Sequence, residues 1–535
     1  MGMYLNSNAA YTLYQSERQK PYFVDKTKLL EELCPIVLQG NNYICITRPR
    51  RFGKTVMANM IGSFFAKGVD SHKVFEQLKI SESEEYGRHL NKHNVIYIDF
   101  SKMPDEINTY DAYINNIKIL MKEDLQAAYP NVEFREKGSV SENLERIRLK
   151  TGEKFLFVLD EWDAVFHMSF ITGEEQKRYL LFLKDLLKDR AYVSLAYMTG
   201  VLPVSKYSGG SELNMFKEYS MSARVRFSEY FGFTEAEIDM LYQRYLNDNR
   251  NPKVTREGLK TWYDGYFTMS GERMYNPRSV VNALEDNQLS NYWTNSGPYD
   301  EIFYYIRNNI ADVRDDLVLM VAGERVEAKV QEYAATSMNL QTRDEIFSAM
   351  VVYGLLTYDD GMVSIPNKEL MSNFAALLKK ESSLGYVHRL AKESARMLRA
   401  TKAGDTKTMA LILSYAHNTE TPILSYNNEV ELSAIVNLVY LSARDKYRVE
   451  REDKAGIGYV DFIFYPNRPG DDCIILELKV DHTPDEAIQQ IKDREYALRF
   501  KGKLCETSRY TGRILAVGIG YDKDTKKHEC KVEVL

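Results

Sequence analysis

Short apolar runs alternate with amphipathic segments in the first part of the chain. The runs at 43–47, 95–100, 155–159 and 191–198 have the length and residue types of strands. The run at 155–159 is apolar throughout, as expected for a parallel strand covered on both faces. Residues 55–67 space their apolar side chains as a helix does. Strands separated by helices predict a three-layer α/β domain with a parallel sheet over residues 1–230.

The pattern becomes mainly helical over residues 231–421, where 233–246 and 387–398 are amphipathic. One interruption at 353–365 places Asp-Gly between two β-rich runs, which predicts a hairpin. A hairpin beside helices favours a winged-helix-like subdomain in this middle region.

Residues 422–535 return to a mixed pattern. The order is a helix at 429–443, strands at 447–450, 459–465 and 473–480, a helix at 484–500, and strands at 513–521 and 530–535. Pro484 followed by two acidic residues is typical of a helix start. We therefore predict a separate C-terminal α/β domain.

Composition is that of an ordinary globular protein, with 44% hydrophobic and 27% charged residues in 535. This length is too great for one core, so several domains are expected. The sequence shows no signal peptide and no apolar run of about 18 residues, and its five cysteines form no CxxC motif. We expect a cytoplasmic protein with no membrane association. The net charge of −6 means that nucleic-acid binding requires a local basic patch.

The eight histidines form no recognised metal motif. His89 and His93 have helical spacing, but Leu90 stands where a zinc-peptidase helix carries glutamate. The sequence predicts a solvated helix face here.

A phosphate-binding loop is predicted between the strand at 43–47 and the helix that follows it. Gly53 lets the backbone approach a phosphate, Lys54 reaches the β and γ phosphates, and Thr55 offers a hydroxyl to Mg²⁺. We expect Arg51 and Phe52 to complete the nucleotide contacts. The first glycine of the usual motif is absent and Arg48 stands there. Gly-Lys-Thr can occur by chance, but the flanking strand and helix favour a nucleotide site.

A matching acidic motif follows the apolar run at 155–159. The strand delivers Asp160 to the sheet edge, where it can hold Mg²⁺ through water, and Glu161 can polarise the attacking water. The alternative is a strand end followed by a surface turn. The next strand ends near Thr199, which is predicted to sit beside the nucleotide as a polar sensor, with a purely structural strand end equally open.

These motifs resemble the AAA-ATPase-like family of bacterial proteins. The similarity rests on Arg48-Pro49-Arg50-Arg51-Phe52-Gly53-Lys54, Asp160-Glu161-Trp162-Asp163, Tyr22–Thr27, Trp262–Tyr266 and Tyr275–Ser279. The family has tyrosine where this chain has Trp162. The resemblance covers about the first 300 residues, explains the missing glycine, and implies binding of ATP and Mg²⁺.

A second cluster of chemistry is predicted near the C-terminus. Because side chains alternate along a strand, Glu477 and Lys479 point to the same face. Asp461, on the preceding strand, would add a second carboxylate, and two carboxylates can hold Mg²⁺ beside a phosphate. A lysine there can orient water or stabilise charge on the phosphate. The alternative is a solvated cross-strand ion pair, but so apolar a strand should be central, where charges need a reason.

This segment resembles the PD-(D/E)xK nuclease superfamily, which implies a restriction-endonuclease-like fold. By that resemblance Asp461 and Glu477 hold Mg²⁺ or Mn²⁺, Lys479 assists the water, and Glu429 and Gln490 shape the site, with Glu431 as an alternative to Glu429. Domains of this type can also bind DNA without cutting it.

Together the two resemblances imply an ATP-hydrolysing protein coupled to a Mg²⁺-dependent nuclease that cleaves DNA, with a role in defence or mobile-element biology. The alternative is an ATP-driven signalling or assembly switch whose C-terminal domain binds nucleic acid without cutting. The expected partners are ATP and DNA, and a homo-oligomer is compatible with both hypotheses.

Overall fold

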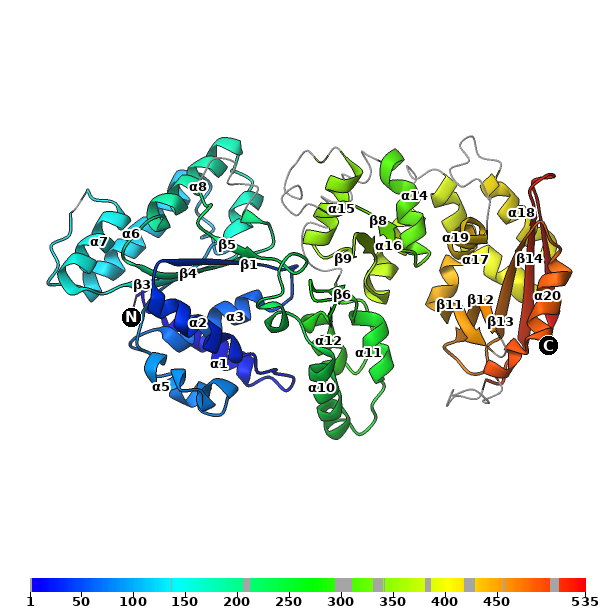
Figure 1. Cartoon of the computed structure of the whole chain (residues 1–535), viewed down its shortest axis with the longest axis horizontal. Coiled ribbons are helices and arrows are strands. Elements are labelled where there is room, and N and C mark those ends of the chain that lie inside the picture. Colours follow the sequence, from blue (N-terminus) through cyan, green and yellow to red (C-terminus); the bar gives the residue numbers. More distant parts are fainter. Residues whose placement is uncertain are drawn as a thin grey trace. The chain divides into compact units, whose positions relative to one another are not determined.

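The computed structural model describes residues 2–135, 137–204, 212–293, 310–330, 340, 342–380, 386–417, 429–455, 458–500 and 510–535. The chain divides into two compact units. Unit 1 contains Met1–Ser296 and Glu327–Glu369, and unit 2 contains Gly297–Val326 and Leu370–Leu535. Each unit is built around its own sheet (Figure 1).

Unit 1 is centred on a five-stranded parallel sheet. Its order is β2-β3-β4-β1-β5, and every adjacent pair is parallel. The predicted strands are therefore confirmed, with small shifts at their ends. The strands are β1 (Asn42–Thr47), β2 (Asn94–Asp99), β3 (Phe155–Asp160), β4 (Val193–Gly200) and β5 (Lys217–Tyr219).

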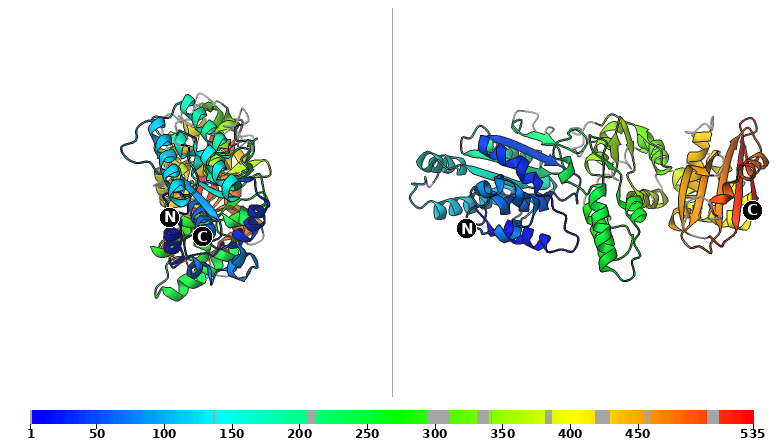
Figure 2. Two further views of the ribbon diagram at one scale, coloured as in Figure 1. Left: turned by 90° about the vertical axis from the view of Figure 1, so that its left-hand side faces the viewer. Right: turned by 60° about the horizontal axis from the view of Figure 1, so that its bottom comes forward.

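Helices cover both faces of this sheet, and the strand residues alternate between the two cores. Ile44 and Ile46 pack with the helices on one face, whereas Cys45 packs with those on the other. The three-layer prediction is confirmed, as the views in Figures 1 and 2 show. One layer contains α1 (Asn8–Arg18), α2 (Lys28–Gln39) and α3 (Lys54–Phe65), and the other contains α6 (Tyr110–Ala128), α7 (Val140–Thr151) and α8 (Gly173–Leu187).

Smaller elements complete unit 1. The Asp-Gly hairpin is confirmed: β9 (Thr357–Asp359) and β10 (Met362–Ser364) pair antiparallel, and Asp360 (φ 48°) and Gly361 (φ 77°) are both left-handed, as a type I′ turn requires. Its classification as a winged helix stays a prediction. The remaining elements are α4 (His72–Phe75), η1 (Lys79–Glu82), α5 (Glu85–His89), η2 (Trp162–His167), η3 (Ser228–Tyr230), α10 (Glu235–Asp248), α11 (Arg256–Tyr263), β6 (Tyr266–Phe267), β7 (Arg273–Met274), α12 (Pro277–Glu285), α15 (Arg343–Val352), β9 (Thr357–Asp359) and β10 (Met362–Ser364).

Unit 2 holds a mixed sheet of order β11-β12-β13-β14-β15, in which only β13 and β14 are parallel. The prediction that the Glu-x-Lys strand is central is confirmed, because β13 is the third of five strands. The strands are β11 (Tyr447–Ala455), β12 (Gly458–Pro466), β13 (Cys473–Val480), β14 (Ile514–Asp522) and β15 (Lys527–Val534). The helices are α14 (Ile310–Val321), α17 (Tyr386–Ala403), α18 (Thr406–His417), α19 (Glu429–Val439), η6 (Leu441–Asp445), α20 (Pro484–Asp493) and η7 (Tyr496–Arg499). Two further elements, β8 (Val326–Glu327) and α16 (Lys368–Lys380), fall at the divisions between the units.

Two predicted helices end earlier than the sequence pattern indicated. The helix predicted over 484–500 ends at Asp493, because Glu495 takes a left-handed conformation (φ 53°) before the short η7 turn. The helix predicted over 429–443 ends at Val439 and continues as the 3₁₀ turn η6. The domain boundaries at 230 and 421 stay predictions.

The predicted solvated face at His89 is wrong. The helix α5 is only five residues long, and its inner side turns toward α2, so that His89 is 1% exposed. The ring of His93 stacks on that of His89, with the two centroids 5.0 Å apart. Periodicity could not reveal this because so short a helix has too few residues to display a face. In the described part of the chain, no helix has the length and apolarity needed to cross a membrane.

Candidate functional site

The phosphate loop joins β1 to α3 and is shaped by one glycine. Gly53 has a φ of 84°, a left-handed conformation that favours glycine, and the direction of its missing Cβ is open. Lys54 and Thr55 then begin α3, whose first N–H groups lack helical partners. The loop therefore presents backbone donors and a helix N-terminus at one point, which is the arrangement that binds phosphate.

Lys54 is held inside this loop. It is 6% exposed, and its Nζ donates to the carbonyl oxygens of Arg48 at 2.9 Å and Pro49 at 3.0 Å. Burial lowers its pKa, although the carboxylates of Asp163 and Glu161 act in the opposite direction. The ammonium group is thus positioned by the loop and balanced by the acidic groups facing it.

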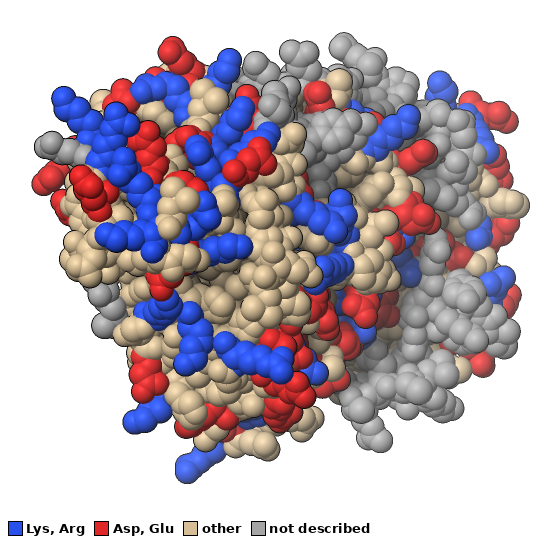
Figure 3. All heavy atoms as spheres, turned by 60° about the vertical axis from the view of Figure 1, so that its left-hand side comes forward, with Lys and Arg blue, Asp and Glu red and all other residues tan. Residues whose placement is uncertain are grey.

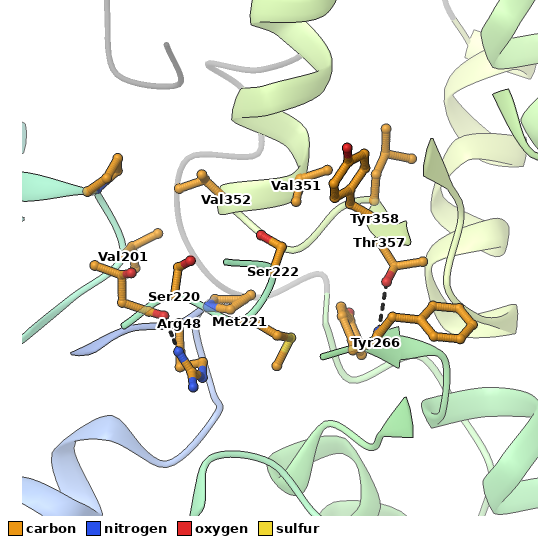
Figure 4. Close-up of a pocket in the computed structure, with 15 residues that line it drawn as sticks. Arg48, Val201, Ser220, Met221, Ser222, Tyr266, Val351, Val352, Thr357 and Tyr358 are labelled. Carbon is orange, nitrogen blue, oxygen red and sulfur yellow. Dashed lines mark hydrogen bonds between the residues drawn. The ribbon is translucent and has the colours of Figure 1, made fainter. Parts of the chain in front are cut away.

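Arg48, which replaces the first glycine, supports the fold. Its guanidinium group donates to the carbonyl oxygens of Thr47 at 2.8 Å and Tyr219 at 2.7 Å, and lies over the ring of Phe231. Figure 4 shows Arg48 beside Ser220 and Met221 at a cavity of about 30 Å³. That volume is comparable to one water molecule, so this cavity is too small to hold a nucleotide. Arg48 links β1 to β5 through its bond to Tyr219.

The acidic motif ends β3 as predicted. Asp160 is fully buried, and the Thr199 hydroxyl donates to its carboxylate, while the Glu161 N–H donates to the Thr199 hydroxyl at 3.4 Å. Burial raises the pKa of Asp160 to about 6, and hydrogen bonds from Thr199 and Thr55 oppose the rise. The Oδ2 atom of Asp160 has no hydrogen-bond partner. An orphaned buried carboxylate oxygen near the exposed Thr55 fits the oxygen ligands that Mg²⁺ prefers.

Thr199 therefore lies between the two acidic residues and not on the wall of the larger cavity described next. Glu161 does line that cavity. Its backbone is left-handed (φ 48°, ψ 49°), which is uncommon for a non-glycine residue, and this conformation directs the side chain toward the cavity. Burial raises its pKa, and Lys54 lowers it.

The site holds two further acidic residues to which the sequence analysis assigned no role. Asp99 ends β2 beside Asp160 in the parallel register, and its charge raises the pKa of both Asp160 and Glu161. Asp163 accepts the N–H groups of Val201 at 2.9 Å and Leu202 at 2.7 Å and so fixes the loop after β4. A signal for Asp99 was present, because it too ends an apolar strand.

A cavity of about 740 Å³ opens onto the phosphate loop. This volume lies within the range of small-molecule sites, roughly 300–1,000 Å³. The loop supplies cationic side chains, and α12 adds the exposed Arg278. The segment Tyr22–Thr27 also lines this cavity, in part through the aromatic rings of Tyr22 and Phe23. Two further aromatic residues, Tyr230 and Phe233, complete this part of the wall.

Arg51 and Phe52 both line this cavity and also anchor the loop. The ring of Phe52 is buried and packs edge-on against Tyr266, with centroids 5.0 Å apart. Arg51 donates to the carbonyl oxygen of Tyr292, whose N–H donates to the Glu369 carboxylate at 2.7 Å. Glu369 is fully buried and also accepts the Ser279 hydroxyl, at 2.9 Å to its nearer oxygen. The buried Glu369 carboxylate is thus linked to Arg51 through the backbone of Tyr292.

Glu369 should make stability depend on pH. Burial raises its pKa to about 7, well above the 4.5 of a free glutamate. Between these two values the folded state binds more protons than the unfolded state, so its contribution to stability is full at low pH and is lost as pH rises to about 7. A shift of this size corresponds to at most roughly 3 kcal/mol. The Tm of Glu369→Gln should therefore fall less than that of wild type between about pH 5 and pH 8. If the Tm of both proteins fell equally with rising pH, Glu369 would not be the group responsible. Glu257→Gln, at an exposed position on α11, is the control.

The second cluster lies in unit 2, where β12, β13 and α20 meet. The Leu478 N–H donates to Asp461 Oδ2 at 2.7 Å, and the Asp461 N–H lies 3.4 Å from Glu477 Oε2. Lys479 Nζ lies 3.5 Å from Glu477 Oε1, and the Gln490 amide donates to that same oxygen. The structure therefore brings four of the predicted residues together: Asp461, Glu477, Lys479 and Gln490.

Glu477 carries the strongest electrostatic signal of this cluster. It is 3% exposed, and burial together with the Asp461 charge raises its pKa to about 7. A solvated ion pair does not fit such burial. A bound cation would offset the repulsion between the Asp461 and Glu477 carboxylates, and their oxygens suit Mg²⁺ or Mn²⁺.

Close packing of α20 on the sheet brings Gln490 within hydrogen-bonding distance of Glu477. Gly518 on β14 pairs with Glu477, and a Cβ there would lie 2.3 Å from the Pro484 carbonyl oxygen. The glycine thus allows α20 to approach the sheet. Glu429 begins α19, but its side chain and that of the alternative Glu431 lie outside the described part of the structure.

Fold and sites together define a unit with a P-loop ATPase-like fold and a mixed-sheet domain with a nuclease-like carboxylate cluster. Family models agree. Residues 13–208 match the model described as a predicted AAA-ATPase, and residues 431–529 match that of the PD-(D/E)XK nuclease superfamily. Both resemblances inferred from the sequence are confirmed.

One curated relative and two solved structures are similar to parts of this chain. An uncharacterized protein in the vnfD 5′ region of Azotobacter chroococcum mcd 1 is 27% identical over 281 residues, which are 52% of this chain and 51% of that protein, so the chain spans about half of its length. The Walker-type ATPase of Pyrococcus abyssi is 11% identical with a TM-score of 0.37, covering 64% of this chain and 95% of that one. The ORC2 protein of Aeropyrum pernix is 12% identical with a TM-score of 0.32, covering 66% and 97%.

Proposed function

We propose that this protein binds and hydrolyses ATP with Mg²⁺ in unit 1 and cleaves DNA with Mg²⁺ or Mn²⁺ in unit 2. The observation that carries the proposal is the cluster of Asp461, Glu477 and Lys479 on a buried central strand and its neighbour, with Glu477 only 3% exposed. Burying the Glu477 carboxylate beside that of Asp461 has a free-energy cost that a purely structural role does not explain.

In unit 1 the chain's own groups divide the work. Lys54 and the N–H groups at the start of α3 bind the β and γ phosphates, and Arg51 and Arg278 add positive charge on the cavity wall. Thr55 and Asp160 would hold Mg²⁺, which neutralises phosphate charge when bound. Thr199 holds the Asp160 carboxylate in place. Glu161 accepts a proton from the attacking water, a role helped by its raised pKa.

In unit 2, Asp461 and Glu477 would hold the divalent ion, which lowers the pKa of water and polarises the phosphate when bound. The N–H of Leu478 fixes Asp461, and the amide of Gln490 fixes Glu477. Lys479 orients the attacking water or stabilises charge on the phosphate. Glu429 is assigned a shaping role by family resemblance alone.

The substrate assignment to DNA and the coupling to ATP belong to the same proposal. On the face of the molecule seen in Figure 3, Lys and Arg side chains are interspersed with Asp and Glu. Recognition of DNA therefore depends on a local patch, as the net charge of −6 already indicated. ATP binding and hydrolysis would control the cutter, in defence or mobile-element biology, in the cytoplasm and with or without self-assembly.

The decisive experiment is a cleavage assay of the full chain on linear, circular and single-stranded DNA. It is run with Mg²⁺, with Mn²⁺ and with a chelator, each with and without ATP. Cleavage that requires a divalent ion supports the nuclease, and its response to ATP tests the coupling. ATP hydrolysis without cleavage under every condition would replace the nuclease by an ATP-driven switch that binds nucleic acid.

Replacing Lys54 with alanine should weaken ATP binding by about 10- to 100-fold. Charged hydrogen bonds of this kind contribute about 1.5–3 kcal/mol. Isothermal titration with ATP measures the change. Lys67→Ala is the matched control, because Lys67 lies just beyond the other end of α3 and pairs with Glu153. If the two variants bind ATP equally well, the phosphate-loop assignment is wrong.

A further inference from the structure

A group of potential metal ligands lies in unit 1 outside the nucleotide site. Cys34 on α2 and Glu85 and His89 on α5 each present one ligand atom, and all three atoms lie within 4.8 Å of one another. Glu85 and His89 are four residues apart on a helix, which places them on one side of it. Cys34 is fully buried, and His89 nearly so.

The contact between His89 and Glu85 is close but poorly aligned for a hydrogen bond. His89 Nε2 lies 3.1 Å from Glu85 Oε2, yet neither atom has a hydrogen-bond partner. An N–H on that ring nitrogen would not point at the carboxylate oxygen. A cation held by both atoms would satisfy them together, and around a tetrahedral zinc ion neighbouring ligand atoms lie about 3.3–3.8 Å apart, slightly more than the separation here.

The other nitrogen of His89 is already positioned. Its Nδ1 lies 2.9 Å from His93 Nε2, and the two rings are nearly parallel. The ring of His93 can accept the N–H of His89 Nδ1 through its own Nε2. That bond leaves the lone pair of His89 Nε2 free to bind a metal, which is how metal-bound histidines are usually oriented.

The backbone around His93 is fixed as well. Its N–H donates to the Phe65 carbonyl oxygen at 2.9 Å, and the Asn91 amide bridges to the carbonyl oxygens of Ser63 and Ala66. The ring of Phe65 packs edge-on against both histidines. The supporting residues are therefore held before any ligand arrives.

We propose that Cys34, Glu85 and His89 form a zinc site, with water completing the coordination on the partly exposed side of Glu85. Sulfur and imidazole donors select zinc over Mg²⁺, which prefers oxygen alone. One thiolate, one carboxylate and one neutral imidazole balance the charge of Zn²⁺, so the filled site is neutral and its burial is favourable. Binding converts the Cys34 thiol to a thiolate and releases its proton to solvent.

One zinc ion at this site would link α2 to α5.

The test uses the full chain, stripped with a chelator and titrated with Zn²⁺ and, separately, with Co²⁺. We expect one zinc per chain and a thiolate-to-cobalt charge-transfer absorption, which the Asp461–Glu477 cluster cannot give because its ligand residues carry no sulfur. Cys34→Ser and His89→Gln should each weaken zinc binding at least tenfold, and His93→Phe by about 10- to 100-fold.

His72→Gln is the matched control, because His72 at the start of α4 and Glu76 just after it have the same spacing but are exposed. It should bind zinc as wild type does. The cobalt spectrum of wild type requires no variant, so it decides the question even where Cys34→Ser fails to fold. Absence of the thiolate absorption, or zinc binding that survives both ligand substitutions, would overturn the proposal.

Discussion

Asp461→Asn should reduce DNA cleavage by at least about a thousandfold and leave ATP hydrolysis near the wild-type rate. A bound metal contributes several kcal/mol to phosphate chemistry, and each 1.4 kcal/mol is a factor of ten in rate. Asparagine keeps an oxygen that can accept the Leu478 N–H, now 2.7 Å from Asp461. It removes the negative charge that holds the cation. The substitution therefore separates chemistry from folding better than alanine, which would leave that N–H unpaired.

The matched control is Asp472→Asn in the same domain. Asp472 forms a paired contact with Arg513 at 2.8 and 2.9 Å, just before β13 and β14 begin and at the other end of β13 from Glu477 and Lys479. It should cleave as wild type does. Rates are compared by gel assay at saturating Mg²⁺, with Tm values checked for both variants. Undiminished cleavage by Asp461→Asn would place the active site elsewhere or reveal a contaminating nuclease.

The sequence was sufficient to predict this cluster because the strand pattern alone limits where its side chains can lie. Alternation puts Glu477 and Lys479 on one face, and a strand apolar enough to be central leaves few reasons for charge. The structure adds what pattern cannot show, namely the approach of α20 at Gly518 that brings Gln490 to Glu477. That approach depends on a helix packed across two strands, which is a tertiary contact and not a local preference.

Arg48 and His89 show what the sequence pattern could not predict. Arg48 is charged and lies in a phosphate loop, but its bonds to Thr47 and Tyr219 make it part of the scaffold. His89 has the spacing of a surface helix but is buried against α2. In both cases the partner is distant in the sequence, so residue type and period could not reveal it. Asp99 differs, because the sequence pattern already placed it at a strand end. Its contribution to the site became apparent only from the pairing of its strand β2 with β3.

Glu161→Gln should slow ATP hydrolysis by about 100- to 10,000-fold while ATP still binds. A positioned general base contributes a factor of this size. Glutamine has nearly the same shape but cannot accept the proton from water. Glu161 is suited to the role because its left-handed backbone directs it into the 740 Å³ cavity, and burial raises its pKa toward neutrality. Nucleotide affinity should stay close to wild type, because the phosphate contacts come from Lys54 and the start of α3.

Single-turnover hydrolysis and ATP titration on the same preparation separate these two effects. Glu174→Gln, an exposed substitution at the start of α8, controls for the loss of one surface charge. If Glu161→Gln binds ATP but no longer supports ATP-dependent control of cleavage, then hydrolysis itself drives the coupling. If control persists, ATP binding alone is enough, because the trapped ATP state would already hold unit 1 in the form that acts on unit 2. Normal turnover in Glu161→Gln would assign the base to another residue, and Asp99, which ends the neighbouring strand, would be the first to test.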